Sequence, residues 1–148
     1  MSLISMTGFG RGAASSGGTR VEAEIHSVNR KQFDLRLALP PALAPSEPVY
    51  QDMIHKVVSR GALNGALRLS LGESVIRKGV HVDRALARAY VGTLSRAARS
   101  LGLQDNLGAT LLLQLPEVVR FEVEERDTRH AEALAVRALK SALSGLLR

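Results

Sequence analysis

The chain has 148 residues, of which 45% are hydrophobic and 23% are charged, and this is the balance of an ordinary globular protein rather than of a disordered chain. It contains no cysteine, so disulfide bonds, thiolate catalysis and cysteine-ligated zinc are excluded. The 20 Lys and Arg residues exceed the 14 Asp and Glu residues, and the resulting formal net charge of +6 favours polyanionic partners.

The first predicted strand covers residues 4–11. Within it, Gly8 and Gly10 indicate either a bulge or the close approach of another backbone. The glycine-rich residues 12–19 that follow are predicted to form a loop.

The next two segments alternate strictly between apolar and polar side chains. Residues 21–26 and 33–39 are therefore predicted to be two half-buried strands. We expect them to form a hairpin in which Ile25 pairs with Leu35, because this register turns both apolar sets to one face. The register leaves residues 29–31 as a three-residue turn, whereas a five-residue loop would keep the faces and shift the partners.

Helical periodicity dominates three later segments. The first helix is predicted to begin near Ser46, a candidate cap, and to end at Gly61. A second helix is predicted over residues 83–101. A third, over residues 128–147, carries a wide leucine stripe, and this stripe indicates that the helix packs against a partner.

Two shorter segments complete the order of elements. Residues 67–71 alternate as a fourth strand, and the apolar residues 109–119 are predicted to form a brief helix and a loop. The order βββαβα favours a two-layer α+β domain with helices on one sheet face and the other face open. The break near residues 123–128 is the only credible domain boundary, so we expect one domain over residues 4–123 and a separate helix over residues 128–148.

The alternating strands gather titratable side chains on one sheet face. These residues are Glu22, Glu24, His26, Asp34, Arg36 and Arg68. The predicted hairpin sets Glu24 opposite Arg36 and His26 opposite Asp34, so that His26 would titrate near neutral pH as a general acid or base. The candidate catalytic residues are therefore Glu24, His26 and Asp34. The alternative is a solvated face held by cross-strand salt bridges.

Cations and amides suited to phosphate binding lie near this face. The predicted turn carries them at its tip, and Arg60 either reaches a phosphate or caps the first helix. The candidate RNA-binding residues are Arg11, Asn29, Arg30, Lys31, Arg36, Arg60 and Arg68.

Metal and base-stacking sites have weaker signals. The four histidines show no pair at ligand spacing, although Glu22 and Glu24 are the kind of carboxylates that hold Mg²⁺ or Mn²⁺. Aromatic residues make up 3% of the chain, which argues against base stacking of the kind used by RNA-recognition sheets.

Several of these residues fall in motifs that resemble the YicC-like family of bacterial endoribonucleases, also described as stress-induced proteins. The motifs occur in family order from about Ser5 to Val119. They are Ser5-Met6-Thr7-Gly8-Phe9-Gly10-Arg11, Glu24, Ser27-Val28-Asn29, Asp34, Leu39-Pro40, Arg60-Gly61, Tyr90 and Leu115-Pro116.

The resemblance implies an N-terminal domain like the ribosomal protein S5 domain 2-like fold, followed by a helical domain that the helix over residues 128–148 would begin. It also implies a metal-dependent endoribonuclease, using Mn²⁺ or Mg²⁺, that cleaves single-stranded RNA as a ring-like homo-oligomer. It leaves open whether this chain is active alone.

Two hypotheses follow. In the first, the chain is the RNA-binding and assembly domain of such an endoribonuclease. In the second, it is a non-catalytic oligomerisation or adaptor module that binds protein through its sheet face and its C-terminal helix. In either case no apolar run approaches the roughly 20 residues of a membrane span, and no signal peptide is recognisable, so we expect a cytoplasmic protein without a membrane partner.

Overall fold

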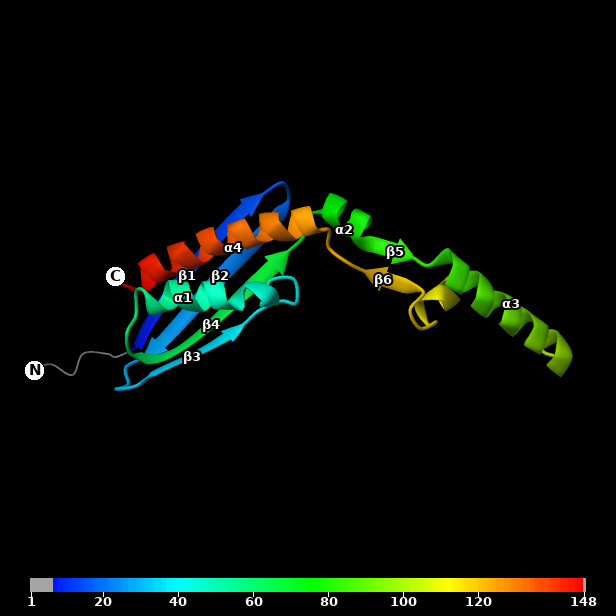
Figure 1. Cartoon of the computed structure of the whole chain (residues 1–148), viewed down its shortest axis with the longest axis horizontal. Helices are drawn as coiled ribbons and strands as arrows, with labels where there is room; N and C mark the ends of the chain where they lie inside the picture. The colour runs from blue at the N-terminus through cyan, green and yellow to red at the C-terminus, as the bar shows by residue number, and fades with distance from the viewer. Residues whose placement is uncertain (1–6, 148) are drawn as a thin grey trace, which may run out of the picture. The chain divides into compact units, whose positions relative to one another are not determined.

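The computed structural model describes residues 7–147, which fall into two compact units that are described separately. The first unit holds the residues up to Val75 and those from Glu124 onward, and the second unit is Ile76–Val123. In Figure 1 the blue N-terminal strand and the red C-terminal helix lie side by side, so segments far apart in the sequence pack together in the first unit. The structure is of the α+β class, as expected.

A four-stranded sheet forms the base of the first unit, with the strand order β1-β2-β4-β3. Strands β1 (Thr7–Ser16), β2 (Thr19–Val28) and β4 (Gly61–Ser70) are antiparallel neighbours. Strand β3 (Phe33–Ala38) runs parallel to β4. A parallel pair needs a crossover connection, and the chain between β3 and β4 accordingly carries a helix.

The predicted hairpin between residues 21–26 and 33–39 is wrong. β2 pairs with β1 on one side and with β4 on the other, so Ile25 lies opposite Gly10 and Gly65. β3 is added beyond β4. The alternation determines which side chains share a face, but backbone hydrogen bonds carry no sequence signal, so it does not determine which strands are neighbours.

The predicted loop over residues 12–19 is also wrong. β1 continues to Ser16, and only Gly17 and Gly18 form the turn into β2. Their φ values of 60° and 82° lie in the left-handed region that a two-residue hairpin turn requires. The part of the first predicted strand that covers residues 4–6 lies outside the described residues.

Helix α1 (Glu47–His55) follows the 3₁₀ turn η1 (Ala44–Ser46), in agreement with the predicted start of the helix. It ends well before Gly61, because Gly61 begins β4 with a φ of 113°. Ser46 occupies the N-cap position but makes no capping hydrogen bond. Its hydroxyl instead donates to the Glu132 carboxylate of the C-terminal helix, so this contact joins the two helices.

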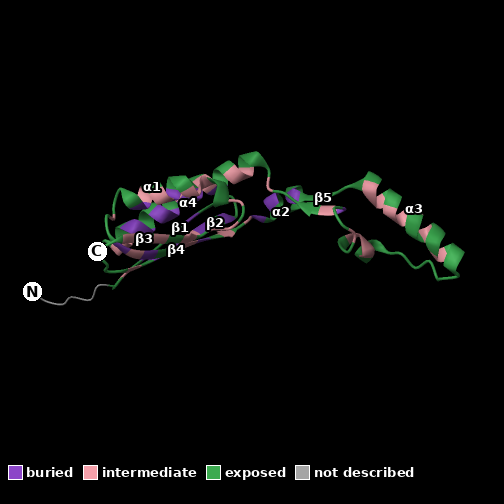
Figure 2. Cartoon of the chain, turned by 60° about the horizontal axis from the view of Figure 1, so that its bottom comes forward, coloured by how far each residue is buried: buried purple, intermediate pink, exposed green. Residues whose placement is uncertain are grey.

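The C-terminal helix α4 (Glu125–Leu146) packs on the same sheet face as α1, as Figure 2 shows by the purple colour of its buried side. Its buried residues are Ala131, Leu134, Ala135, Ala138, Leu139, Ala142 and Leu143. They share one core with Val21, Ala23 and Ile25 of β2. The leucine stripe thus finds its partner within this chain, and α4 belongs to the core of the first unit.

Two glycines of β1 allow α4 to approach closely. A Cβ atom added to Gly10 would collide with the carbonyl oxygen of Ala142, and one added to Gly12 would collide with that of Ala138. Of the two alternatives that the sequence offered for the glycines of this strand, the structure shows close backbone approach.

The second unit contains a two-stranded sheet in which β5 (Val80–Val82) pairs antiparallel with β6 (Val119–Phe121). Helix α2 (Glu73–Gly79) precedes β5. The 3₁₀ helix η2 (Ala109–Leu113) is the brief helix predicted within residues 109–119.

Helix α3 (Arg84–Leu101) also forms where the periodicity predicts it. The Asp83 carboxylate accepts a hydrogen bond of 3.0 Å from the backbone N–H of Leu86, which is an N-cap, and Gly102 ends the helix with a φ of 69°. All residues of α3 are described, and none of them is buried.

The packing of α4 on β1 predicts a large effect of adding a side chain to β1. We expect Gly10→Val to lower the free energy of unfolding by about 3 kcal/mol, because the helix backbone must move away from the strand. Urea denaturation measures this change. The control is Ala13→Val, which enlarges an exposed residue of the same strand and should change the free energy by less than about 0.5 kcal/mol. Equal stability of the two variants would contradict the packing.

Candidate nucleic-acid interface

The sheet face turned away from α1 and α4 carries polar side chains from all four strands. Buried and exposed residues alternate along β2, with Val21, Ala23 and Ile25 in the core. The strand registers place the alternate residues on the other side. We call this side the open sheet face, and its residues are Phe9, Arg11, Glu22, Glu24, His26, Asp34, Arg36, Asn64 and Arg68. It contains all six titratable residues that the sequence placed together.

The predicted neighbours on this face are nevertheless wrong. His26 of β2 and Arg36 of β3 both lie opposite Asn64 of β4. β4 therefore separates His26 from Asp34 by two strand spacings, about 10 Å. Asp34 forms an ion pair with Arg36 of its own strand, whose Nε lies 4.0 Å from the carboxylate. Asp34 is therefore not placed to orient the His26 ring.

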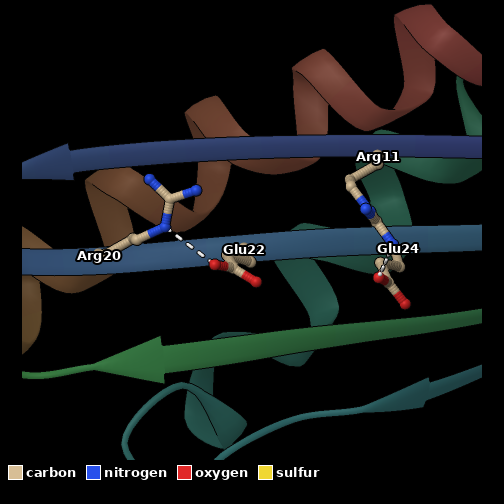
Figure 3. A network of polar contacts seen from close by, with 4 residues as sticks. All are labelled: Arg11, Arg20, Glu22 and Glu24. Atoms are coloured by element: carbon tan, nitrogen blue, oxygen red, sulfur yellow. Dashed lines mark hydrogen bonds and ion pairs between the residues drawn. The ribbon is translucent and has the colours of Figure 1, made fainter.

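Two ion pairs organise the glutamates of the open sheet face (Figure 3). Arg11 of β1 donates from Nη2 to Oε1 of Glu24 on β2 at 2.8 Å. The prediction that Glu24 lies opposite Arg36 is therefore wrong. Arg20 donates from Nε to Oε1 of Glu22 at 2.9 Å within β2. The hydrogen bond and positive charge of Arg20 hold the pKa of Glu22 below its ordinary value. Glu22 is therefore an ionised carboxylate at neutral pH.

A pocket of about 280 Å³ lies at one end of the sheet. We call it the sheet-end pocket, and its lining residues are Thr7, Gly8, Ser27, Val28, Asn29, Val58, Arg60 and Gly61. The antiparallel order brings together the start of β1, the end of β2 and the start of β4, which are far apart in the sequence. Thr7, Ser27, Asn29 and Arg60 therefore bring hydroxyl, amide and guanidinium groups to this end of the sheet, with Thr7 on the open face and Ser27 on the face covered by α4.

The sheet-end pocket joins two of the predicted RNA-binding residues, Asn29 and Arg60. Because α1 ends at His55, Arg60 lies beyond the last turn of that helix and does not cap it. Arg30 and Lys31 are exposed in the connection that leaves the pocket toward β3. Sequence reasoning missed Thr7 and Ser27 as site residues. Both lie inside motifs shared with the family, and this position could have identified them.

A second depression, of about 530 Å³, lies along the edge of the sheet between β1 and α4. Three of its lining residues are cations: Arg11, Arg137 and Lys140. No sequence signal pointed to Arg137 and Lys140, because they lie on the exposed side of a helix whose packing direction was unknown. They extend the basic surface from the open sheet face around the β1 edge.

The carboxylates of the open sheet face lie beside arginines. Within residues 7–147, no group of three or more His, Asp or Glu side chains is placed to hold a metal ion together. Glu22 and Glu24, the carboxylates that the sequence offered as suitable for a hard cation, accept hydrogen bonds from Arg20 and Arg11 respectively.

Comparison with known proteins identifies the class of this chain. Residues 3–148 match the family model described as "Endoribonuclease YicC-like, N-terminal region", so the chain belongs to the YicC-like endoribonuclease family, as the motifs indicated. A curated relative is the "Probable endoribonuclease YicC" of Clostridioides difficile (strain 630), which is 25% identical over 141 residues. The match covers 95% of this chain and 47% of the relative, so the chain spans about half the length of that protein.

Among the helices that the structure describes, none is both long and apolar enough to cross a bilayer.

The Arg20–Glu22 pair predicts a measurable titration. The pKa of Glu22 is lowered in the folded protein, so the folded state favours the ionised carboxylate. The ion pair is lost as the pH falls through that pKa. In Arg20→Gln we expect the Glu22 pKa to rise toward its ordinary value, as followed by carboxyl ¹³C NMR. An unchanged pKa would assign the effect to Arg68 and Arg11 and contradict the prediction.

Proposed function

We propose that this chain is the RNA-binding and assembly region of a cytoplasmic YicC-like endoribonuclease, and that its ligand is single-stranded RNA. The observation that carries the proposal is the sheet-end pocket. Its lining residues include Thr7, Ser27, Asn29 and Arg60, which bring hydroxyl, amide and guanidinium groups to one end of the sheet. These groups are the donors that proteins use to hold phosphates.

The cations around the pocket extend the contact along the RNA backbone. Arg30 and Lys31 lie in the connection between the pocket residue Asn29 and β3. Arg36 and Arg68 lie on the open sheet face. Arg11 faces both this surface and the depression beside α4. Such contacts are independent of base sequence, and they explain how a chain with a net charge of +6 would hold many different RNAs.

Cleavage is proposed for the whole protein, because this chain matches about half of its relative. Glu24, His26 and Asp34 remain the candidate catalytic residues. Glu24 and His26 alternate on one strand, so their Cα atoms lie roughly 7 Å apart on the same face, which is close enough to serve one phosphodiester. Dependence on Mn²⁺ or Mg²⁺ is proposed from the family resemblance.

We expect Arg60→Gln to weaken binding of a labelled single-stranded RNA about 10-fold, because a charged phosphate donor is lost from the pocket. The slope of log K against log salt concentration should fall by about 0.7, the contribution of one neutralised phosphate. Fluorescence anisotropy at several salt concentrations measures both quantities.

The control for this experiment is Arg120→Gln. It removes the same charge from an exposed side chain of the second unit that pairs with Glu122 at 3.7 Å. Arg120→Gln should leave the affinity and the slope close to those of the unmodified chain. Equal losses in both variants would show that net charge, and not the sheet-end pocket, binds the RNA.

The second candidate function is assembly, and helix α3 favours it. The C-terminal helix cannot serve as the predicted protein contact through its leucine stripe, since that stripe is buried in the core. α3 has an uncovered apolar side instead, formed by Leu86, Tyr90, Leu94 and Leu101. Its arginines lie on the opposite side by helical periodicity: Arg84, Arg88, Arg96 and Arg99. Two copies could therefore join their apolar sides while keeping like charges apart.

We expect the double variant Leu94→Gln/Leu101→Gln to abolish concentration-dependent self-association, because both side chains belong to the uncovered apolar side. Sedimentation equilibrium measures the association, and circular dichroism checks that the helix content is kept. The matched control is Arg88→Gln/Arg96→Gln on the other side of the helix, which should still associate. A monomeric unmodified chain would reject the assembly role of α3.

A further inference from the structure

An aromatic ring lies in the open on the polar face of the sheet. Phe9 of β1 is 48% exposed, while its neighbour Gly10 faces the core. The centroid of the Phe9 ring is 4.7 Å from that of His26, with 52° between the ring planes. The guanidinium carbon of Arg11 lies 5.6 Å from the Phe9 centroid. Arg11 thus lies over one face of the ring, the tilted His26 ring contacts it as well, and the rest of the ring is open to solvent.

The supports of Phe9 are themselves fixed. Arg11 is held by its 2.8 Å ion pair with Glu24, which Figure 3 shows on the open sheet face. His26 lies on the middle of the sheet, between β1 and β4. A ring whose orientation is already restricted loses little conformational entropy when a flat ligand stacks on it. Nothing in the core requires a phenylalanine at this outward position.

The register continues the row of Phe9 across the whole sheet. Phe9 lies opposite His26, His26 opposite Asn64, and Asn64 opposite Arg36. The row therefore offers, in order, an aromatic face, an imidazole, an amide and a guanidinium. An asparagine amide both donates and accepts hydrogen bonds and can read the edge of a base, and a guanidinium holds phosphate.

We propose that Phe9, supported by His26 and Arg11, is a stacking site for an unpaired nucleobase of single-stranded RNA, with Asn64 facing the base edge. The inference rests on the proposed function for its ligand, and it adds the site and the class of RNA that the site takes. Bases stack on exposed aromatic rings in sequence-tolerant single-strand binding. The low aromatic content of the sequence does not prevent this, because one ring at the right position is sufficient.

The place of Phe9 beside the sheet-end pocket supports the same ligand. Thr7 lines the pocket, and Phe9 follows it two residues later on the same side of β1. Two residues of a strand span roughly 7 Å, a distance that one nucleotide bridges. A phosphate in the pocket would therefore leave its base near Phe9. In duplex RNA the bases are stacked on each other and cannot reach the ring, so the site selects single strands.

The test compares Phe9→Leu with the unmodified chain for binding of a single-stranded RNA. Leucine keeps an apolar side chain and removes the aromatic face. We expect binding to weaken about 10-fold with an unchanged salt slope, because stacking releases no counterions. Phe9→Trp should bind at least as tightly as the unmodified chain. Affinity for a duplex of the same length should be equal in all three proteins.

A double-mutant cycle that combines Phe9→Leu with changes in the RNA tests whether Phe9 contacts one particular base. Each protein is titrated with RNAs that carry a single abasic site at successive positions. One abasic position should weaken the unmodified chain about 10-fold and leave Phe9→Leu unaffected, since both changes remove the same contact. Cross-linking of RNA that carries 5-iodouridine at that position should modify Phe9 or His26, as located by mass spectrometry.

Two negative results are distinguishable. If Phe9→Leu binds single-stranded RNA as tightly as the unmodified chain while Arg60→Gln binds weakly, the stacking site is wrong and the proposed function stands. If the unmodified chain binds no RNA, both are overturned. Urea denaturation of Phe9→Leu excludes a folding defect as the cause of weaker binding, because the exposed ring contributes little to the core.

Discussion

The contact between the backbone of α4 and strand β1 is the constraint on which the first unit depends. The carbonyl oxygens of Ala138 and Ala142 occupy the positions that Cβ atoms would take at Gly12 and Gly10. The helix can therefore lie close enough to fill the core above β1 and β2 with alanines and leucines. Because α4 and α1 together cover one sheet face, the polar residues of every strand are left on the other face.

The strand order converts this arrangement into a site. An inserted β4 separates β2 from β3, which removes the His26–Asp34 neighbourhood that a hairpin would have created. The same insertion places the start of β4 beside the end of β2, and this proximity forms the sheet-end pocket with Asn29 and Arg60. The position of β4 in the sheet thus separates His26 from Asp34 and brings Asn29 close to Arg60.

The sequence was informative where a local pattern determines the outcome. Alternation placed Glu22, His26 and Arg68 on one face, and periodicity located α3 and α4 almost to their ends. It failed where the outcome depends on a distant segment. Backbone hydrogen bonds and the turn at Gly17 decide whether β2 pairs with β3 or with β4. The surface that the α4 leucines pack against depends on Gly10 and Gly12, which lie far from α4 in the sequence.

The charges and the exposed ring of the open sheet face have separable roles in the proposed binding. Arg11 is already neutralised by Glu24, so a phosphate gains less from it than from a cation whose charge is not so compensated. Its more effective contribution is to hold the ring of Phe9. The salt dependence should then come from Arg60, Arg30 and Lys31, and the preference for unpaired RNA from Phe9. Affinity and selectivity would therefore reside in different side chains of the same surface.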